Sequence, residues 1–359
     1  MTYIKNPAFS NEPLPVEIVF HPSWWHKHCG IDFDEDFFYH PLKRVESERR
    51  MEKELYERFG QFGLGSDYDK DLPLIGAVHN AAGYLLSEML GCEIRYFADS
   101  APQVIPAQKT DFHVDVDAAF AGPAFKRLEK LMSELKSRYG YLKGDVNWGG
   151  ILNLAMDLRG EEILMDFLLQ PDEVKLYFKK IAELIERFFC FIQQETGSNS
   201  ISVNRNVINI TPAVYLHSEC SHTMISEEQY EEFLLPFDVE WSKKYRPYGV
   251  HYCGPDPHRH AAQMAKIPHL DFLDAGWGGD MVCLRKHLPS TFINIRLDPV
   301  SINTMSCETL EQHIRRLVND CANPWLTGIC CINMDDKVTD DKIHTIFSTA
   351  QQLRREYRL

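Results

Sequence analysis

Two residue types that bind metals, His251 and Cys253, lie one position apart where an apolar stretch runs into Gly254. In a β-strand, residues i and i+2 point to the same side, so this imidazole and this thiol can face one point. The carboxyl end of a strand is also where a parallel α/β barrel builds its site. A second apolar run, Leu326–Ile332, carries Cys330. This pattern predicts a metal site formed by His251, Cys253 and Cys330.

The ligand types favour zinc, and the number of ligands favours a catalytic ion. Three protein ligands with an open fourth position are typical of catalytic zinc, whereas structural zinc is closed by four. Zinc that holds a substrate sulfur or oxygen lowers the pKa of that group and presents it for reaction. The sequence therefore indicates thiol or methyl chemistry. A buried free cysteine is also an ordinary core residue, which is the alternative for each thiol.

Size and charge limit the class of protein. The chain has 359 residues, of which 44% are hydrophobic and 25% are charged, so it can bury the core of one large domain or two ordinary ones. The formal net charge is -14. Broad binding to nucleic acid or to an anionic membrane needs a basic surface, so we expect neither kind of partner.

The chain also has the features of a cytoplasmic protein. The segment Met1–Pro7 does not resemble a signal peptide, and no apolar run approaches the roughly 20 residues of a membrane helix. The ten cysteines are scattered singly except for one adjacent pair. Such thiols are expected to stay reduced in a cytoplasm rather than to form a disulfide framework.

The order of expected elements predicts the fold class. In the last third of the chain, strand-like runs alternate with helical patterns and short turns, which predicts βα units and a parallel sheet. Upstream, Pro15–Phe20 is a predicted strand and Pro123–Tyr139 a predicted helix with proline near its start and glycine after its end. The other expected strands and long helices are strands 74–78, 93–97, 146–154, 201–210, 214–217, 250–253, 270–275, 291–297 and 325–332, and helices 46–59, 171–194, 307–320 and 340–356.

Several short motifs, in order along the chain, resemble the uroporphyrinogen decarboxylase superfamily. They are Val250–Gly254, Phe272–Asp274, Asn294–Pro299, Leu158–Gly160, Gln170–Pro171, Ile225–Ser226 and Leu235–Pro236. The resemblance covers roughly residues 74–359. It implies a TIM (β/α)8 barrel over 74–359, preceded by an N-terminal extension, residues 1–73, that includes the first strand and helix.

Within that superfamily the chain is more similar to the zinc-dependent corrinoid methyltransferases than to the decarboxylases. The decarboxylases carry an arginine-rich segment after the first strand, and His21–His26 contains no arginine. The methyltransferases have His-X-Cys followed far downstream by a cysteine in a Gly-Cys-X-Ile setting. Here Ile329 separates Gly328 from Cys330, so Cys331 remains an alternative third ligand.

The resemblance implies an activity and its partners. A methyl group would move between a small O-, N- or S-methyl compound, or a thiol, and the cobalt of a corrinoid protein. Zn²⁺ would be the resident metal, and methylcobalamin would be carried by the partner. Two rivals remain open, namely a tetrapyrrole decarboxylase without metal and a non-catalytic corrinoid-binding barrel. The oligomeric state is also open, a homodimer included.

Five further residues are predicted to serve the site. Glu219, with His217, ends a strand-like run and could act as a general acid or base at the barrel mouth. The alternative is a polar loop at the rim. His21 and Trp24 could line a substrate pocket, with an aromatic plug at the barrel base as the alternative. Asn147 is included as a substrate contact without support from its spacing.

Overall fold

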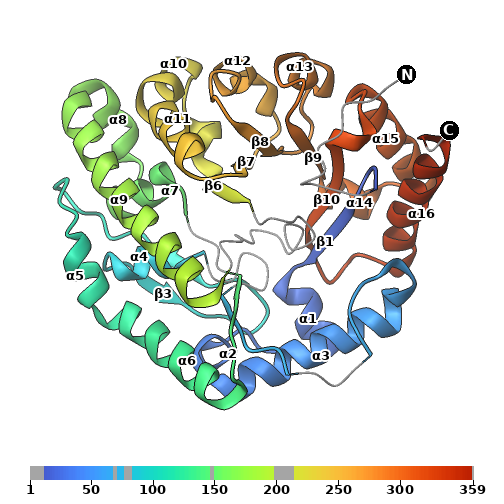
Figure 1. Cartoon of the computed structure of the whole chain (residues 1–359), viewed down its shortest axis with the longest axis horizontal. Coiled ribbons are helices and arrows are strands. Elements are labelled where there is room, and N and C mark those ends of the chain that lie inside the picture. The colour runs from blue at the N-terminus through green and yellow to red at the C-terminus, as the bar shows by residue number, and fades with distance from the viewer. Residues whose placement is uncertain (1–11, 68–70, 77–82, 146–148, 198–213, 358–359) are drawn as a thin grey trace. The chain divides into compact units, whose positions relative to one another are not determined.

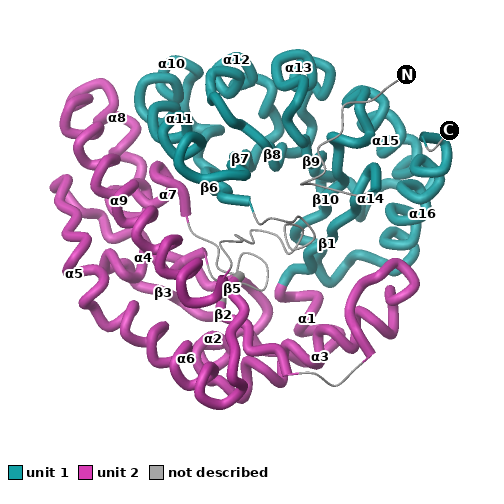
Figure 2. Tube along the Cα trace, in the orientation of Figure 1, with its two compact units in different colours: residues 1–21, 204–359 teal, residues 22–203 magenta. Residues whose placement is uncertain are grey.

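The computed structural model describes residues 12–67, 71–76, 83–145, 149–197 and 214–357 (Figure 1). The chain divides into two compact units (Figure 2). The sheet unit combines residues 1–21 with 204–359, and the helical unit comprises residues 22–203.

The sheet unit is built on six parallel strands whose order, among the described residues, is β1-β10-β9-β8-β7-β6. The strands are β1 (Val16–Phe20), β6 (Tyr215–Glu219), β7 (Tyr248–Tyr252), β8 (Leu270–Asp274), β9 (Phe292–Leu297) and β10 (Thr327–Met334). Every residue of β1, β7 and β9 is buried. Both faces of the sheet are therefore covered, as is usual for parallel strands.

Helices follow the strands in chain order and lie outside the curved sheet (Figure 1). They are α10 (Glu227–Gln229), α11 (Leu235–Lys244), α12 (Ala261–Met264), α13 (Met281–His287), α14 (Pro299–Thr304), α15 (Cys307–Asp320) and α16 (Asp340–Tyr357). Shorter helical turns are η4 (Cys220–Met224), the π-helical η5 (Tyr230–Leu234), η6 (Pro257–His260) and η7 (Pro324–Leu326). Each helix returns the chain to the same end of the sheet, which is why consecutive strands run parallel.

The helical unit packs long amphipathic helices around two small strand pairs. Strands β2 (Leu74–Gly76) and β5 (Lys143–Asp145) pair in parallel, and β3 (Glu93–Arg95) and β4 (Gln103–Ile105) pair antiparallel. The helices are α1 (Pro22–Cys29), α2 (Glu35–Tyr39), α3 (Pro41–Phe59), α4 (Leu85–Met89), α5 (Val116–Ala121), α6 (Pro123–Tyr139), α7 (Ile151–Arg159), α8 (Glu162–Leu169) and α9 (Pro171–Thr196), with a turn η1 (Gly60–Phe62). No helix of the described segments is long and apolar enough to span a lipid bilayer.

The predicted elements are confirmed best where helical signals are strong. Helix α6 has the predicted bounds, Pro123–Tyr139, and Gly140 after it adopts a left-handed conformation with φ 79°. The predicted strand 146–154 is wrong, because α7 starts at Ile151. Its buried apolar residues recur at helical spacing, and a short apolar run does not by itself distinguish helix from strand. The predicted strand 201–210 lies outside the described residues.

The α/β class and the curved parallel sheet are as predicted, but the closed eight-stranded barrel is borne out only in part. The described residues give six strands in one sheet, and the parallel pair β2-β5 forms a separate sheet. The two compact units divide the chain at other positions than the predicted boundary after residue 73, which stays a prediction about domains.

The loops that follow β7 and β8 touch at their backbones. A Cβ atom built on Gly276 would lie 1.8 Å from the carbonyl oxygen of Gly254 and 2.6 Å from its nitrogen. Only glycine allows the backbones of two loops to approach so closely. The contact fixes the turn directly after Cys253 against the end of β8.

Replacing this glycine should therefore weaken the sheet unit. Gly276→Ala is expected to lower the free energy of unfolding by about 1–3 kcal/mol, because backbone atoms must move apart. Urea denaturation measures the change. Gly149→Ala is the matched control, since the nearest atom to its added Cβ, Leu154 Cδ2, lies at an ordinary 3.4 Å. Equal stability of the two variants would contradict the predicted clash.

Candidate metal centre

One group of three potential metal ligands is present among the described residues: Cys220, His251 and Cys253. One ligand atom from each residue lies within 4.8 Å of the other two. Strand register explains this proximity. Glu219 pairs with Tyr252 at the ends of β6 and β7. The residues that follow them, Cys220 and Cys253, therefore lie side by side.

His251 is held by a carboxylate on the neighbouring strand. Its Nδ1 lies 2.6 Å from Oδ2 of Asp274, the residue opposite it on β8. Its Nε2 is buried and makes no hydrogen bond to the described residues. An imidazole whose one nitrogen is fixed by a carboxylate presents the other nitrogen to a metal, which is the usual arrangement of a histidine ligand.

Arg296, fully buried on β9, completes the polar network. Its Nη2 donates to Oδ2 of Asp274 at 2.7 Å, and its Nη1 donates to Sγ of Cys253 at 3.6 Å. Nη2 also lies 2.8 Å from His251 Nδ1. Since Nδ1 cannot both donate to the carboxylate and accept from the guanidinium, we assign its proton to the contact with the anionic Asp274.

The electrostatics of the two cysteines differ sharply. The hydrogen bond from Cys220, the contact with His251 and the Arg296 cation lower the pKa of Cys253 far below its ordinary value despite burial. The same hydrogen bond, with burial and the charge of Cys253, raises the pKa of Cys220 well above its ordinary value. The pKa values of the two thiols are therefore displaced in opposite directions. A divalent metal would stabilise both thiolates.

The residues present fit a zinc ion. Tetrahedral zinc with bonds of about 2.3 Å to sulfur and 2.0–2.1 Å to nitrogen separates its ligand atoms by about 3.5–3.8 Å, close to the observed grouping within 4.8 Å. Charge also balances. Two thiolates neutralise Zn²⁺, and the buried Asp274 and Arg296 neutralise each other. Nε2 of His251, which is buried and has no hydrogen-bond partner by geometry among the described residues, would be the third ligand.

The structure does not bring Cys330 into this group. Cys330 lies opposite Arg296 on β9 and opposite Glu17 on β1, so it faces the same side of the sheet as His251 and Cys253. It stands, however, three strands away from β7, with β8 and β9 between, and packs with Val19 and Ile332. Cys220 is only one strand away. Cys331, the alternative ligand, is buried and alternates to the other face.

His217 and Glu219 lie on the opposite face of the sheet from His251. Because Ser218 pairs with His251, its two neighbours on β6 must point the other way, toward α11. There His217 Nδ1 contacts Oδ1 of Asp238 at 2.7 Å, and its ring packs edge-on against Trp241. The predicted catalytic pair therefore lies between sheet and helices.

A buried hydrogen-bond network surrounds this pair. Asp238 also accepts hydrogen bonds from the hydroxyl groups of Tyr230 at 2.7 Å and Tyr248 at 2.6 Å. Nε2 of His217 lies 3.8 Å from Oε2 of Glu219, and Oε1 of Glu219 accepts from the backbone nitrogen of Ser221 at 3.2 Å. The network thus ends on the η4 turn, which carries Cys220.

The structure describes two of the three predicted substrate residues, His21 and Trp24. His21 follows β1, and its backbone nitrogen donates to Met334 at the end of β10. Trp24 belongs to the helical unit, where it is buried with Trp25 at a ring separation of 4.8 Å and with Phe59 at 6.5 Å. Asn147 lies outside the described residues. Their roles in substrate binding stay predictions.

The sequence interpretation missed Cys220, Asp274 and Arg296 as members of the site. Asp274 and Arg296 each lie two residues or fewer from the end of a predicted strand, where barrel sites collect polar residues. Cys220 directly follows the predicted Glu219. Its proximity to Cys253 follows from the register of β6 against β7, which cannot be read from the sequence.

Comparisons with known proteins support the fold. No protein-family model and no curated protein matches the sequence. Among solved structures, a methyltransferase from Methanosarcina mazei superposes with a TM-score of 0.65 at 10% identity, covering 96% of this chain and 95% of that one. A B12-independent methionine synthase from Shewanella sp. W3-18-1, solved with selenomethionine, gives a TM-score of 0.52 at 10% identity, covering 96% and 98%. At this identity the likeness shows a shared fold.

Breaking the buried ion pair of Arg296 and Asp274 should lower the free energy of unfolding far more than breaking a pair at the surface. Arg296→Leu leaves the Asp274 charge buried without its cation and is expected to cost about 3–5 kcal/mol in free energy of unfolding. Arg246 is the matched control, because its side chain is exposed where it contacts Asp271 at 2.6 Å, and Arg246→Leu should cost at most about 1 kcal/mol. Denaturant titration of both variants measures the difference. Equal losses would contradict the account of the buried pair.

His260 should make the fold sensitive to acid. Burial, with the Arg259 cation, lowers its pKa to about 4, against about 6.5 in an unfolded chain. Because the folded pKa is the lower one, its contribution to stability is complete above pH 6.5 and is lost as the pH falls toward 4. His260→Gln should therefore lose less stability than wild type between pH 7 and pH 4.5.

The exposed His269 provides the control for this measurement. His269→Gln should follow the wild-type dependence of unfolding free energy on pH. If His260→Gln follows it as well, the imidazole of His260 does not resist protonation in the folded protein.

Proposed function

We propose that this chain is a zinc-dependent methyltransferase that moves a methyl group between a small O-, N- or S-methyl compound, or a thiol, and the cobalt of a corrinoid protein. The observation that carries the proposal is the convergence of Cys220, His251 and Cys253, with a buried histidine nitrogen that makes no hydrogen bond to the described residues. The fold shared with a methyltransferase structure supports it.

The ligand set departs from the one expected from sequence. Cys220 takes the place of Cys330 because it emerges beside Cys253 at the adjacent strand end. Two thiolates and one imidazole leave the fourth position of a tetrahedral ion for substrate, which is the pattern of a catalytic site. When bound, zinc would lower the pKa of a substrate thiol or hydroxyl group and hold that atom for methyl transfer.

The surrounding residues of this chain orient the ligands. Asp274 fixes the His251 ring so that Nε2 remains available, and Arg296 holds Asp274 in place. Arg296 also donates to Cys253, and its charge adds to the hydrogen bond from Cys220 in lowering the pKa of that thiol. Such supporting groups typically change metal affinity by 10–100-fold when they are removed.

We assign His217 and Glu219 a positioning role. Both lie on the helix side of β6, and Glu219 accepts a hydrogen bond from the backbone of the η4 turn. The Asp238 network thereby holds the turn that presents Cys220.

Metal analysis of variants tests the ligand set. The purified full chain should bind one zinc ion, and Cys220→Ala or Cys253→Ala should weaken binding by more than about 100-fold, beyond the loss expected for a supporting residue. Cys330→Ala is the matched control and should bind zinc like wild type. Tight zinc binding by Cys220→Ala, or its loss in Cys330→Ala, would contradict the proposed ligands.

Methyl transfer tests the activity. The zinc-loaded chain should transfer the methyl group of added methylcobalamin to a small thiol, followed by the change in the corrinoid absorption spectrum. Removal of zinc should abolish the transfer and its return should restore it. A tetrapyrrole decarboxylase would instead work without metal, so activity that persists in a chelator would support that rival.

A further inference from the structure

The two cysteines of the metal group lie at neighbouring ends of hydrogen-bonded strands. Glu219 of β6 is paired with Tyr252 of β7, and Cys220 and Cys253 follow them directly. Adjacent strands are about 4.7–4.9 Å apart. Disulfides join Cα atoms that are about 4.4–6.8 Å apart, so the strand pairing that ends one residue before the two cysteines has a spacing that a disulfide can span.

The side chains have suitable positions as well. The two sulfur atoms lie within 4.8 Å of each other, and both residues face the same side of the sheet. Side-chain rotation can close such a gap to the S–S bond length of about 2.05 Å. As whole residues both are half-buried, whereas Cys92, Cys321, Cys330 and Cys331 are buried. The argument for a link therefore rests on how close the two sulfur atoms lie.

We propose that Cys220 and Cys253 form a disulfide when the chain is metal-free and meets a hydroperoxide, and that this bond excludes the metal until a thiol reductant reopens it. One sulfur attacks the peroxide, the O–O bond breaks, and a sulfenic acid and water form. The second thiol then attacks the sulfenic sulfur, the S–O bond breaks, and a second water leaves with the thiol proton. Two thiols and one hydrogen peroxide thus give one disulfide and two waters.

The disulfide is a modification of the chain itself, and only its effect on zinc rests on the proposed function. A disulfide has no thiolate to offer, so a metal would retain His251 as its single ligand from the group. Bound metal should protect both sulfurs in turn. The pair would make methyl transfer dependent on the thiol and peroxide levels around the protein.

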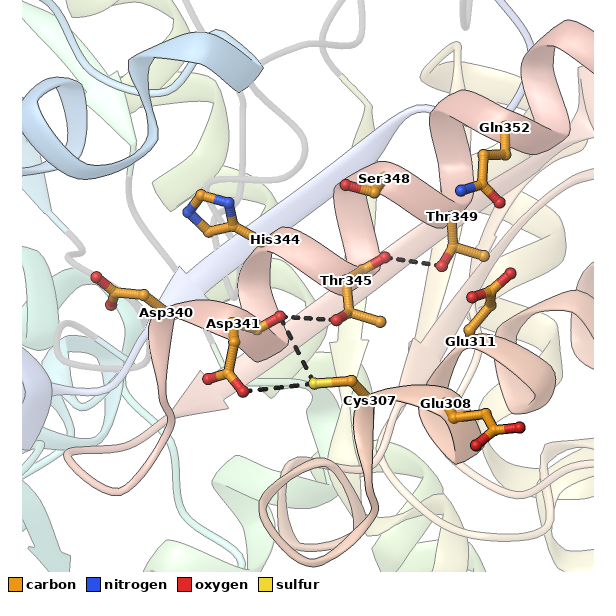
Figure 3. A pocket seen from close by; sticks show the side chains of 10 residues that line it. All are labelled: Cys307, Glu308, Glu311, Asp340, Asp341, His344, Thr345, Ser348, Thr349 and Gln352. Carbon is orange, nitrogen blue, oxygen red and sulfur yellow. Dashed lines mark hydrogen bonds between the residues drawn. The ribbon is translucent and has the colours of Figure 1, made fainter.

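Cys307 offers a matched control thiol in the same unit. It lies in a surface groove of about 680 Å³ between α15 and α16 (Figure 3). Its sulfur lies 3.4 Å from Oδ2 of Asp341, and Glu308 and Glu311 also line the groove. Like Cys220 and Cys253 it is half-buried, but the groove brings no second cysteine to it.

The test treats the metal-free full chain with a stoichiometric amount of hydrogen peroxide and counts free thiols in denaturant. The thiol count should fall by two, and digestion without reductant should yield one linked pair of peptides containing residues 220 and 253. Cys220→Ser should lose the linked pair, and Cys307→Ser should keep it. Chain loaded with zinc should be oxidised at least about tenfold more slowly, because metal-bound thiolates are withheld from the oxidant.

Zinc uptake completes the experiment. The oxidised chain should bind no zinc, and dithiothreitol should restore both the two thiols and the uptake. A linked pair that includes any cysteine other than these two, or sulfonic acids without a link, would overturn the proposal. A Cys220–Cys253 link in a chain that takes up no zinc even when reduced would leave the disulfide standing and refute the proposed function.

Discussion

The site depends on one buried ion pair, Arg296 with Asp274. Both groups are buried, and burying either charge alone would cost several kcal/mol. Each is stabilised by the other at 2.7 Å. The pair does more than neutralise itself. Asp274 holds Nδ1 of His251, and Arg296 reaches Cys253. Three adjacent strands thereby fix the ring and one thiol of the proposed metal centre.

Strand alternation divides the polar residues of β6 and β7 into two sets with different tasks. His251 and Cys253 share one face with Asp274 and Arg296, where the proposed metal would lie. His217, Glu219 and Tyr248 face the helices, where His217 and Tyr248 contact Asp238 and Glu219 lies beside His217. The two sets meet at the η4 turn, since Glu219 supports its backbone and Cys220 begins it. Chemistry and support are thus placed on opposite sides of one sheet.

The sequence predicted which residues share one face of a strand better than it predicted which strands lie side by side. The pair His251 and Cys253 is predictable because a spacing of two on a strand fixes one face. Alternation also meant that only one of Cys330 and Cys331 could face His251, and strand register shows that it is Cys330. What the sequence could not provide is lateral order. That β6 lies beside β7, and β10 three strands away, follows from the assembled sheet, so the proximity of Cys220 to Cys253 could be found only in the structure.

The central claim is that one metal ion is held by two sulfur atoms and one imidazole nitrogen at this strand edge. X-ray absorption at the zinc edge of the reconstituted chain measures those atoms directly. The account predicts two sulfur neighbours at about 2.3 Å and one nitrogen at about 2.0 Å, with one sulfur fewer in Cys220→Ala. A zinc ion surrounded by oxygen and nitrogen alone, or a sulfur count that Cys220→Ala leaves unchanged, would contradict it.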